Sequence, residues 1–68
     1  MRYHLLSKSL SALLFSCKTK EEMMQKINEI MQTAKQHDVL DDFVVSDDET
    51  LETINAFVWL TIQIRGYL

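Results

Sequence analysis

The fold of this chain depends on residues 57–64, which read Phe-Val-Trp-Leu-Thr-Ile-Gln-Ile. The stretch is rich in strand-forming residues, and its second half alternates apolar with polar positions, as a half-buried strand does. However, a helix start signal precedes the stretch, and the stretch has no clear strand partner except a weak apolar segment at 39–45. We therefore predict a helix over 47–65, with a strand pair from 39–45 and 57–64 as the alternative.

The helix start signal is Ser46 followed three positions later by Glu49. In such a capping box the hydroxyl and the carboxylate satisfy backbone N–H groups of the first turn. Acidic residues near this end also interact favourably with the helix dipole. Gly66 fits the position just past the helix end, where a left-handed conformation is common, and Arg65 is a favourable cation in the last turn.

A second capping box starts at Thr19, with Glu22 in the third position after it. Apolar residues follow at helical spacing from Met23 onward, which is typical of a helix with one buried face. This pattern predicts a helix over 20–36.

The first segment repeats apolar residues at spacings of 3, 4, 3 and 4, which fit one face of a helix. These residues are Tyr3, Leu6, Leu10, Leu13 and Cys17. We predict a helix over 3–18.

Together the three segments predict an all-α fold, a small three-helix bundle that forms a single helical domain over 1–68. The composition agrees with this prediction, because one glycine and no proline are few turn residues for a sheet of tight hairpins. The alternative, with its strand pair, is an α+β fold. With 47% apolar residues, the chain is too hydrophobic for a disordered segment.

A helix over 57–64 would be apolar on nearly every side, and a three-helix bundle of this size cannot cover all of it. We therefore expect a homodimer or another homo-oligomer, or a tightly bound protein partner. Aromatic and large aliphatic residues are common binding anchors. The predicted apolar interface consists of Phe57, Trp59 and Leu60.

Acidic residues are concentrated between positions 38 and 52, and the chain has a net charge of −3. A patch of this kind can steer a basic partner, such as a nucleic-acid-binding protein, into place. The predicted partner-binding acids are Asp41, Asp42, Asp47 and Asp48. The alternative explanation is a solvated loop followed by acids that stabilise a helix N-terminus.

Several kinds of chemistry lack their usual residues. One glycine excludes a Gly-rich phosphate loop, and we expect no paired Cys and His ligands and no Ser/His/Asp arrangement. We therefore expect no enzymatic activity, no catalytic residue, no metal and no cofactor. A single cysteine fits the reducing cytoplasm, and no run approaches the roughly 20 apolar residues of a membrane span.

The sequence thus predicts a small non-enzymatic protein–protein interaction module, a bacterial or phage regulator or inhibitor that occupies a surface of another macromolecule. One alternative is a structural subunit of a homo-oligomeric helical assembly. A second is a small DNA-binding regulator, although the negative net charge opposes direct binding to nucleic acid.

Overall fold

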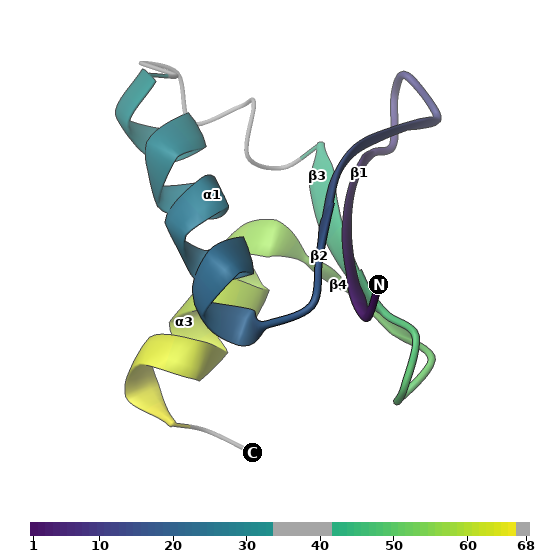
Figure 1. The fold of residues 1–68 in the computed structure, drawn as a ribbon. Coiled ribbons are helices and arrows are strands. Elements are labelled where there is room, and N and C mark those ends of the chain that lie inside the picture. The colour runs from purple at the N-terminus through teal and green to yellow at the C-terminus, as the bar shows by residue number, and fades with distance from the viewer. Residues whose placement is uncertain (34–41, 67–68) are drawn as a thin grey trace.

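The computed structural model describes residues 1–33 and 42–66 and shows an α+β fold (Figure 1). In chain order the elements are β1 (Tyr3–Ser7), β2 (Ala12–Cys17), α1 (Lys20–Thr33), β3 (Phe43–Asp47), β4 (Glu52–Asn55) and α3 (Ala56–Arg65). The prediction of an all-α three-helix bundle is therefore wrong.

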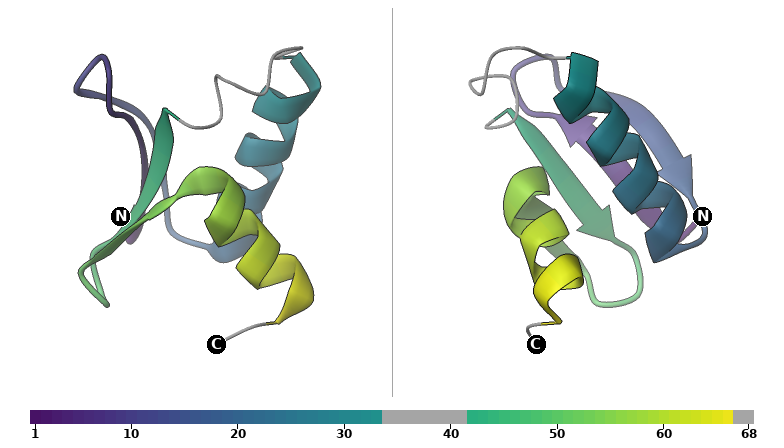
Figure 2. Two further views of the ribbon diagram at one scale, coloured as in Figure 1. Left: turned by 180° about the vertical axis from the view of Figure 1, so that it is seen from behind. Right: turned by 90° about the vertical axis from the view of Figure 1, so that its left-hand side faces the viewer.

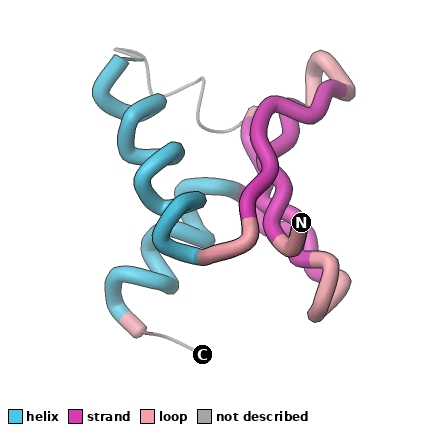
Figure 3. Tube along the Cα trace, in the orientation of Figure 1, coloured by secondary structure: helices cyan, strands magenta, loops and turns pink. Residues whose placement is uncertain are grey.

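The four strands form one antiparallel sheet in the order β2-β1-β3-β4. The helix α1 connects β2 to β3 and so crosses over the central strand β1. The described helices α1 and α3 cover the same face of the sheet, so that helices and strands make two layers (Figures 2 and 3). The other face of the sheet is left uncovered by either helix, and β2 and β4 are its edge strands.

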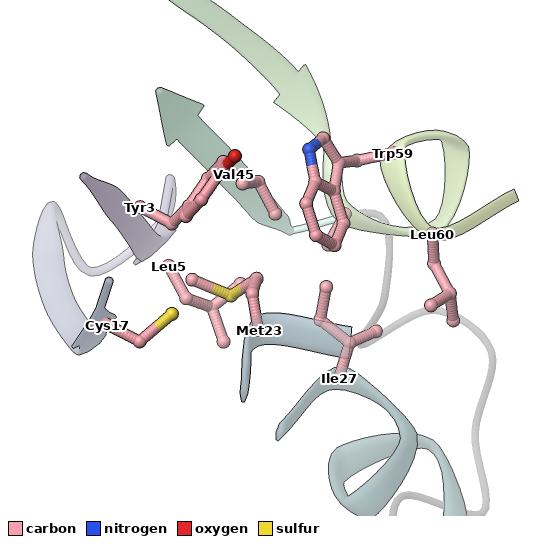
Figure 4. Close-up of a cluster of buried hydrophobic side chains, with 9 residues drawn as sticks. Tyr3, Leu5, Cys17, Met23, Ile27, Val45, Trp59 and Leu60 are labelled. Atoms are coloured by element: carbon pink, nitrogen blue, oxygen red, sulfur yellow. The ribbon is translucent and has the colours of Figure 1, made fainter. Parts of the chain in front are cut away.

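The core lies between these two layers (Figure 4). At its centre Leu5 of β1 is fully buried and pairs with Phe15 of β2 on one side and Val45 of β3 on the other. Tyr3 and Trp59 meet edge to face with ring centroids 5.9 Å apart, an arrangement that aromatic rings favour. The buried apolar cluster contains Tyr3, Leu5, Cys17, Met23, Ile27, Val45, Ala56, Trp59 and Leu60.

The helix predicted over 3–18 is replaced by a hairpin of β1 and β2. Burial in β1 alternates, with Tyr3, Leu5 and Ser7 buried, and this is the period of a strand. The sequence gives no strong turn signal for this hairpin, because the four-residue loop 8–11 contains no glycine or proline. Its last residue, Ser11, instead takes a positive φ of 49°.

The helix predicted over 47–65 begins nine residues late, at Ala56, because its proposed start is the β3–β4 hairpin. The Asp47 carboxylate accepts from the Glu49 N–H at 2.9 Å, so that it closes a turn instead of capping a helix. Asn55 is the true N-cap and accepts from the N–H groups of residues 57 and 58. The predicted end is confirmed, since Gly66 has a φ of 71° and its N–H bonds to the carbonyl of Ile62.

The alternative strand pair is not found either. Residues 57–64 are helical, and β3 pairs with β1 and β4, while residues 39–41 lie outside the described part of the chain. The helix predicted over 20–36 is confirmed from Lys20 to Thr33, with the Glu22 N–H donating to the Thr19 hydroxyl at 3.2 Å. Its last three predicted residues also lie outside the described part.

Trp59→Ala and Phe57→Ala should differ sharply in their effects on stability. Trp59 is 5% exposed, and truncating a buried aromatic residue of this size lowers the free energy of unfolding by about 3–5 kcal/mol. Phe57 is 49% exposed, so its truncation should cost less than about 1 kcal/mol. Urea denaturation followed by circular dichroism measures both; equal losses would contradict the burial of the indole ring.

Leu51→Gly should stabilise the protein. Leu51 is the last residue of the β3–β4 loop, is 86% exposed and has a φ of 62°, a conformation that costs a residue with a Cβ about 1–2 kcal/mol. Glycine removes this cost but loses about 0.4–1 kcal/mol through unfolded-state entropy. We expect the free energy of unfolding to rise by up to about 1 kcal/mol.

Leu10→Gly is the matched control, because Leu10 is an exposed loop leucine without a positive φ. It should lower the free energy of unfolding or leave it unchanged. A gain equal to that of Leu51→Gly would show that backbone strain at Leu51 is not the cause.

Candidate functional site

The outer face of α3 carries the exposed apolar residues Phe57, Val58 and Ile64, which are 49%, 47% and 65% exposed. Of the interface predicted from the sequence, the structure brings only Phe57 to the surface. Trp59 and Leu60 lie in the core instead. We call the exposed residues Phe57, Val58 and Ile64 the α3 outer face.

The helical period explains this division. Ala56, Trp59 and Leu60 form the buried side of α3, whereas Phe57 and Ile64 lie seven positions apart, on one line along the helix. Val58 and Ile64 were not included in the predicted interface, although the spacing from Phe57 to Ile64 could have identified the latter.

A shallow groove of about 260 Å³ between α1 and α3 borders this face. Met31 of α1 and Leu60 of α3 contribute apolar atoms to it, and Phe57 and Ile64 belong to its lining as well. Arg65 is the cation of the same lining. The groove therefore extends the apolar surface of α3 toward α1.

Asp42, one of the predicted partner-binding acids, is bonded within the chain. Its carboxylate accepts from the Ser9 N–H at 2.7 Å, from the Ser9 hydroxyl at 2.8 Å and from the Ser7 hydroxyl. The hydrogen bonds from Ser7 and Ser9 hold the pKa of Asp42 below its usual range. Asp42 thus ties the β1–β2 loop to the start of β3.

Asp47 has the same role at the other end of the sheet. The Arg2 guanidinium donates to both of its oxygens, at 3.1 and 3.2 Å, and this pairing lowers the pKa of Asp47. Arg2 also forms an ion pair with Glu49 at 3.0 Å. Since Asp47 also accepts from the Glu49 N–H, it links the start of β1 to the β3–β4 turn.

Asp48 belongs to a hydrogen-bonded chain on the uncovered face of the sheet. Its carboxylate lies 2.8 Å from Nε2 of His4, and Nδ1 of His4 lies 2.8 Å from the Ser16 hydroxyl. In the neutral imidazole, Nε2–H donates to the carboxylate and Nδ1 accepts from the hydroxyl. The fourth predicted acid, Asp41, lies outside the described residues.

The order of Ser16, His4 and Asp48 is that of a hydrolase triad, an arrangement that the sequence spacing did not reveal. Acyl transfer also requires backbone or side-chain donors that stabilise an oxyanion beside the hydroxyl. Both described helices, with the N–H groups at their N-termini, lie on the opposite face of the sheet (Figure 2). The N-termini of these two helices therefore offer no such donors to Ser16. The hydrogen bonds among the three groups join β1, β2 and the β3–β4 turn.

Comparison with protein-family models, with curated proteins and with solved structures gave no match. Within residues 1–33 and 42–66, no three His, Cys, Asp or Glu residues are grouped so that they could hold a metal ion. Neither described helix has the length and apolar character needed to cross a membrane.

The stability of the protein should fall in acid because of Asp42 and Asp47. Their folded pKa values lie below the ordinary value of 3.8, so their contribution is present above that value and is lost as the pH falls through the folded pKa values. Asp47→Asn should lower the melting temperature at pH 7 and flatten its fall between about pH 4 and pH 2. An unchanged slope in a calorimetric pH series would contradict the assigned pairing with Arg2.

Proposed function

We propose that this chain is a non-enzymatic, cytoplasmic protein–protein interaction module, a regulator or inhibitor that occupies a surface of another protein. The observation that carries the proposal is the α3 outer face, where Phe57, Val58 and Ile64 are exposed on a helix whose other side is already packed. Large apolar side chains exposed together favour association, because burying them removes apolar surface from water.

The chemistry of this face supports a protein partner. Phe57 supplies an aromatic anchor, Ile64 extends the apolar line, and Arg65 places a cation at its border. Anchors of this kind, surrounded by polar groups, are common at the centre of protein interfaces. The competing occupant is a second copy of this chain, which would make the protein a homo-oligomer.

The acidic residues are a weaker support for the proposal. Asp42, Asp47 and Asp48 each have a partner within the chain, so their charges are partly committed to the fold. Asp48 and Glu49 remain 61% and 70% exposed at their side chains and can still attract a basic partner at long range. We assign to these two acids the long-range attraction of the partner, and to the α3 outer face the binding affinity.

Phe57→Ser combined with Ile64→Ser should weaken association without unfolding the protein, because both residues are surface residues. Affinity capture from a lysate of the source cell, followed by titration of the purified captured protein, measures the effect. We expect the dissociation constant to rise on the order of tenfold or more, since each anchor is worth at least about 1 kcal/mol.

The matched control is Leu10→Ser combined with Leu51→Ser, which removes two exposed leucines from the hairpin loops. The control should bind as the parent does. If the α3 variant binds as tightly as the control, the contact surface lies elsewhere. If light scattering shows that the parent is a stable dimer and the α3 variant a monomer, the face joins two copies of the chain.

A further inference from the structure

A second and larger groove, of about 470 Å³, lies beside the edge strand β4. Glu52 and Ile54 of β4 and Trp59 and Ile62 of α3 contribute to its lining, as do Arg2 and Tyr3 at the start of β1. This β4–α3 groove is separate from the α3 outer face, because it is lined by the opposite side of the helix.

Two core residues, Tyr3 and Trp59, also line this groove. Tyr3 and Trp59 are 2% and 5% exposed, and within the described residues neither the Tyr3 hydroxyl nor the Trp59 indole N–H has a hydrogen-bond partner. In the same part of the chain no unpaired side-chain polar atom is sealed from solvent. Both donors are therefore partly open to solvent, both residues line the groove, and Figure 4 shows the two atoms on the same side of the core cluster.

These donors define the chemistry of a ligand. An unpaired donor in a largely dry setting gains most from an acceptor oxygen, and the walls formed by Ile54 and Ile62 favour an apolar group beside that oxygen. Both donors are uncharged, because burial raises the pKa of Tyr3 and keeps its hydroxyl protonated. The lining contains two cations, Arg2 and Lys20, and two carboxylates, Asp47 and Glu52, so the groove has no excess of positive charge. Arg2 is already paired with Asp47 and Glu49. An uncharged carbonyl therefore fits better than a carboxylate.

The strand beside the groove indicates the source of that carbonyl. Within residues 1–33 and 42–66, no strand lies beside the outer edge of β4, and an extended peptide can add to such an edge through its main chain. Side chains of an added strand alternate between the two faces of the sheet. Every second one would therefore point toward the groove, as Glu52 and Ile54 of β4 do.

We propose that the β4–α3 groove binds an extended peptide segment of the partner protein. An apolar side chain of the segment lies between Ile54 and Ile62. One main-chain carbonyl, at the point where the segment leaves the edge of β4 and crosses the groove, accepts from the Tyr3 hydroxyl and the Trp59 indole. This inference rests on the proposed function only in that the partner is a protein; it does not use the α3 outer face.

Trp59 is the only tryptophan of the chain, so its indole N–H gives a single reporter resonance in a ¹H–¹⁵N spectrum. The probe is N-acetyl-leucine methylamide, titrated into the full chain at millimolar concentrations. We expect a saturable shift of the indole resonance. N-acetyl-glycine methylamide, which lacks the apolar side chain, and 4-methylpentanoate, which carries a carboxylate instead of the amide, should each bind more weakly.

Tyr3→Phe removes one donor and keeps the ring in the core. It should weaken binding of the leucine probe about threefold to tenfold, as expected for one neutral hydrogen bond. Ile62→Ala, a change in the groove wall outside the buried cluster, should weaken binding even if Tyr3→Phe perturbs folding. Phe57→Ser, on the α3 outer face, is the control and should leave the affinity unchanged.

Three results would overturn the groove assignment. They are no saturable shift of the indole resonance, an affinity equal to that of the parent protein in both Tyr3→Phe and Ile62→Ala, or tighter binding of the carboxylate than of the amide. Because Phe57→Ser is inert in this titration, the groove and the α3 outer face are tested separately. The groove proposal can therefore hold when the α3 outer face proves inactive, and the α3 outer face can be active when the groove binds no peptide.

Discussion

The pairing of β1 with a strand on each side is the constraint on which the rest of the structure depends. Leu5 sits at the centre of this strand, fully buried, with Phe15 and Val45 as its neighbours across the sheet. The strand β1 joins the two hairpins, because it pairs with β2 on one side and with β3 on the other. The crossover through α1 brings β3 to this second side. Without this strand the two helices have no common surface to cover.

The acidic residues are part of how so short a chain makes two hairpins without glycine. Asp42 accepts hydrogen bonds at the β1–β2 loop, and Asp47 accepts them at the β3–β4 turn while binding Arg2. Carboxylates can replace preferred turn residues in this way, because they satisfy backbone N–H groups that a loop leaves unpaired. A cluster that suggests a binding patch in the sequence is thus largely a set of structural acceptors.

The helix α3 is apolar on nearly every side because its residues lie in three different surroundings: the core, the outer surface and the β4–α3 groove. Trp59 and Leu60 fill the core, Phe57 and Ile64 face outward, and Ile62 lines the β4–α3 groove. The proposed functions use the last two of these surfaces. The same indole ring that completes the core also lines the groove, so core packing would hold the proposed donor in a fixed position.

The sequence alone determined the features that depend on neighbouring residues. The helix from Lys20 to Thr33 follows from its cap and its apolar spacing, and the end of α3 follows from Gly66. The surplus of apolar residues in 57–64 also indicated that this helix contacts more than one surface. These are local effects of capping, dipole and period, and they act whatever the rest of the chain does.

Only the tertiary structure decided the sheet and the sites. The spacing from Tyr3 to Cys17 fits a helix as well as a hairpin, and the choice came from pairing β1 with β3, across about forty residues of sequence. The pattern of Ser46 and Glu49 fits a helix cap as well as a hairpin turn. The hairpin is favoured in the structure, where the Arg2 guanidinium binds the Asp47 carboxylate. Which side of α3 is exposed, and which donors open into a groove, follows from long-range packing, and short-range sequence patterns carry no record of it.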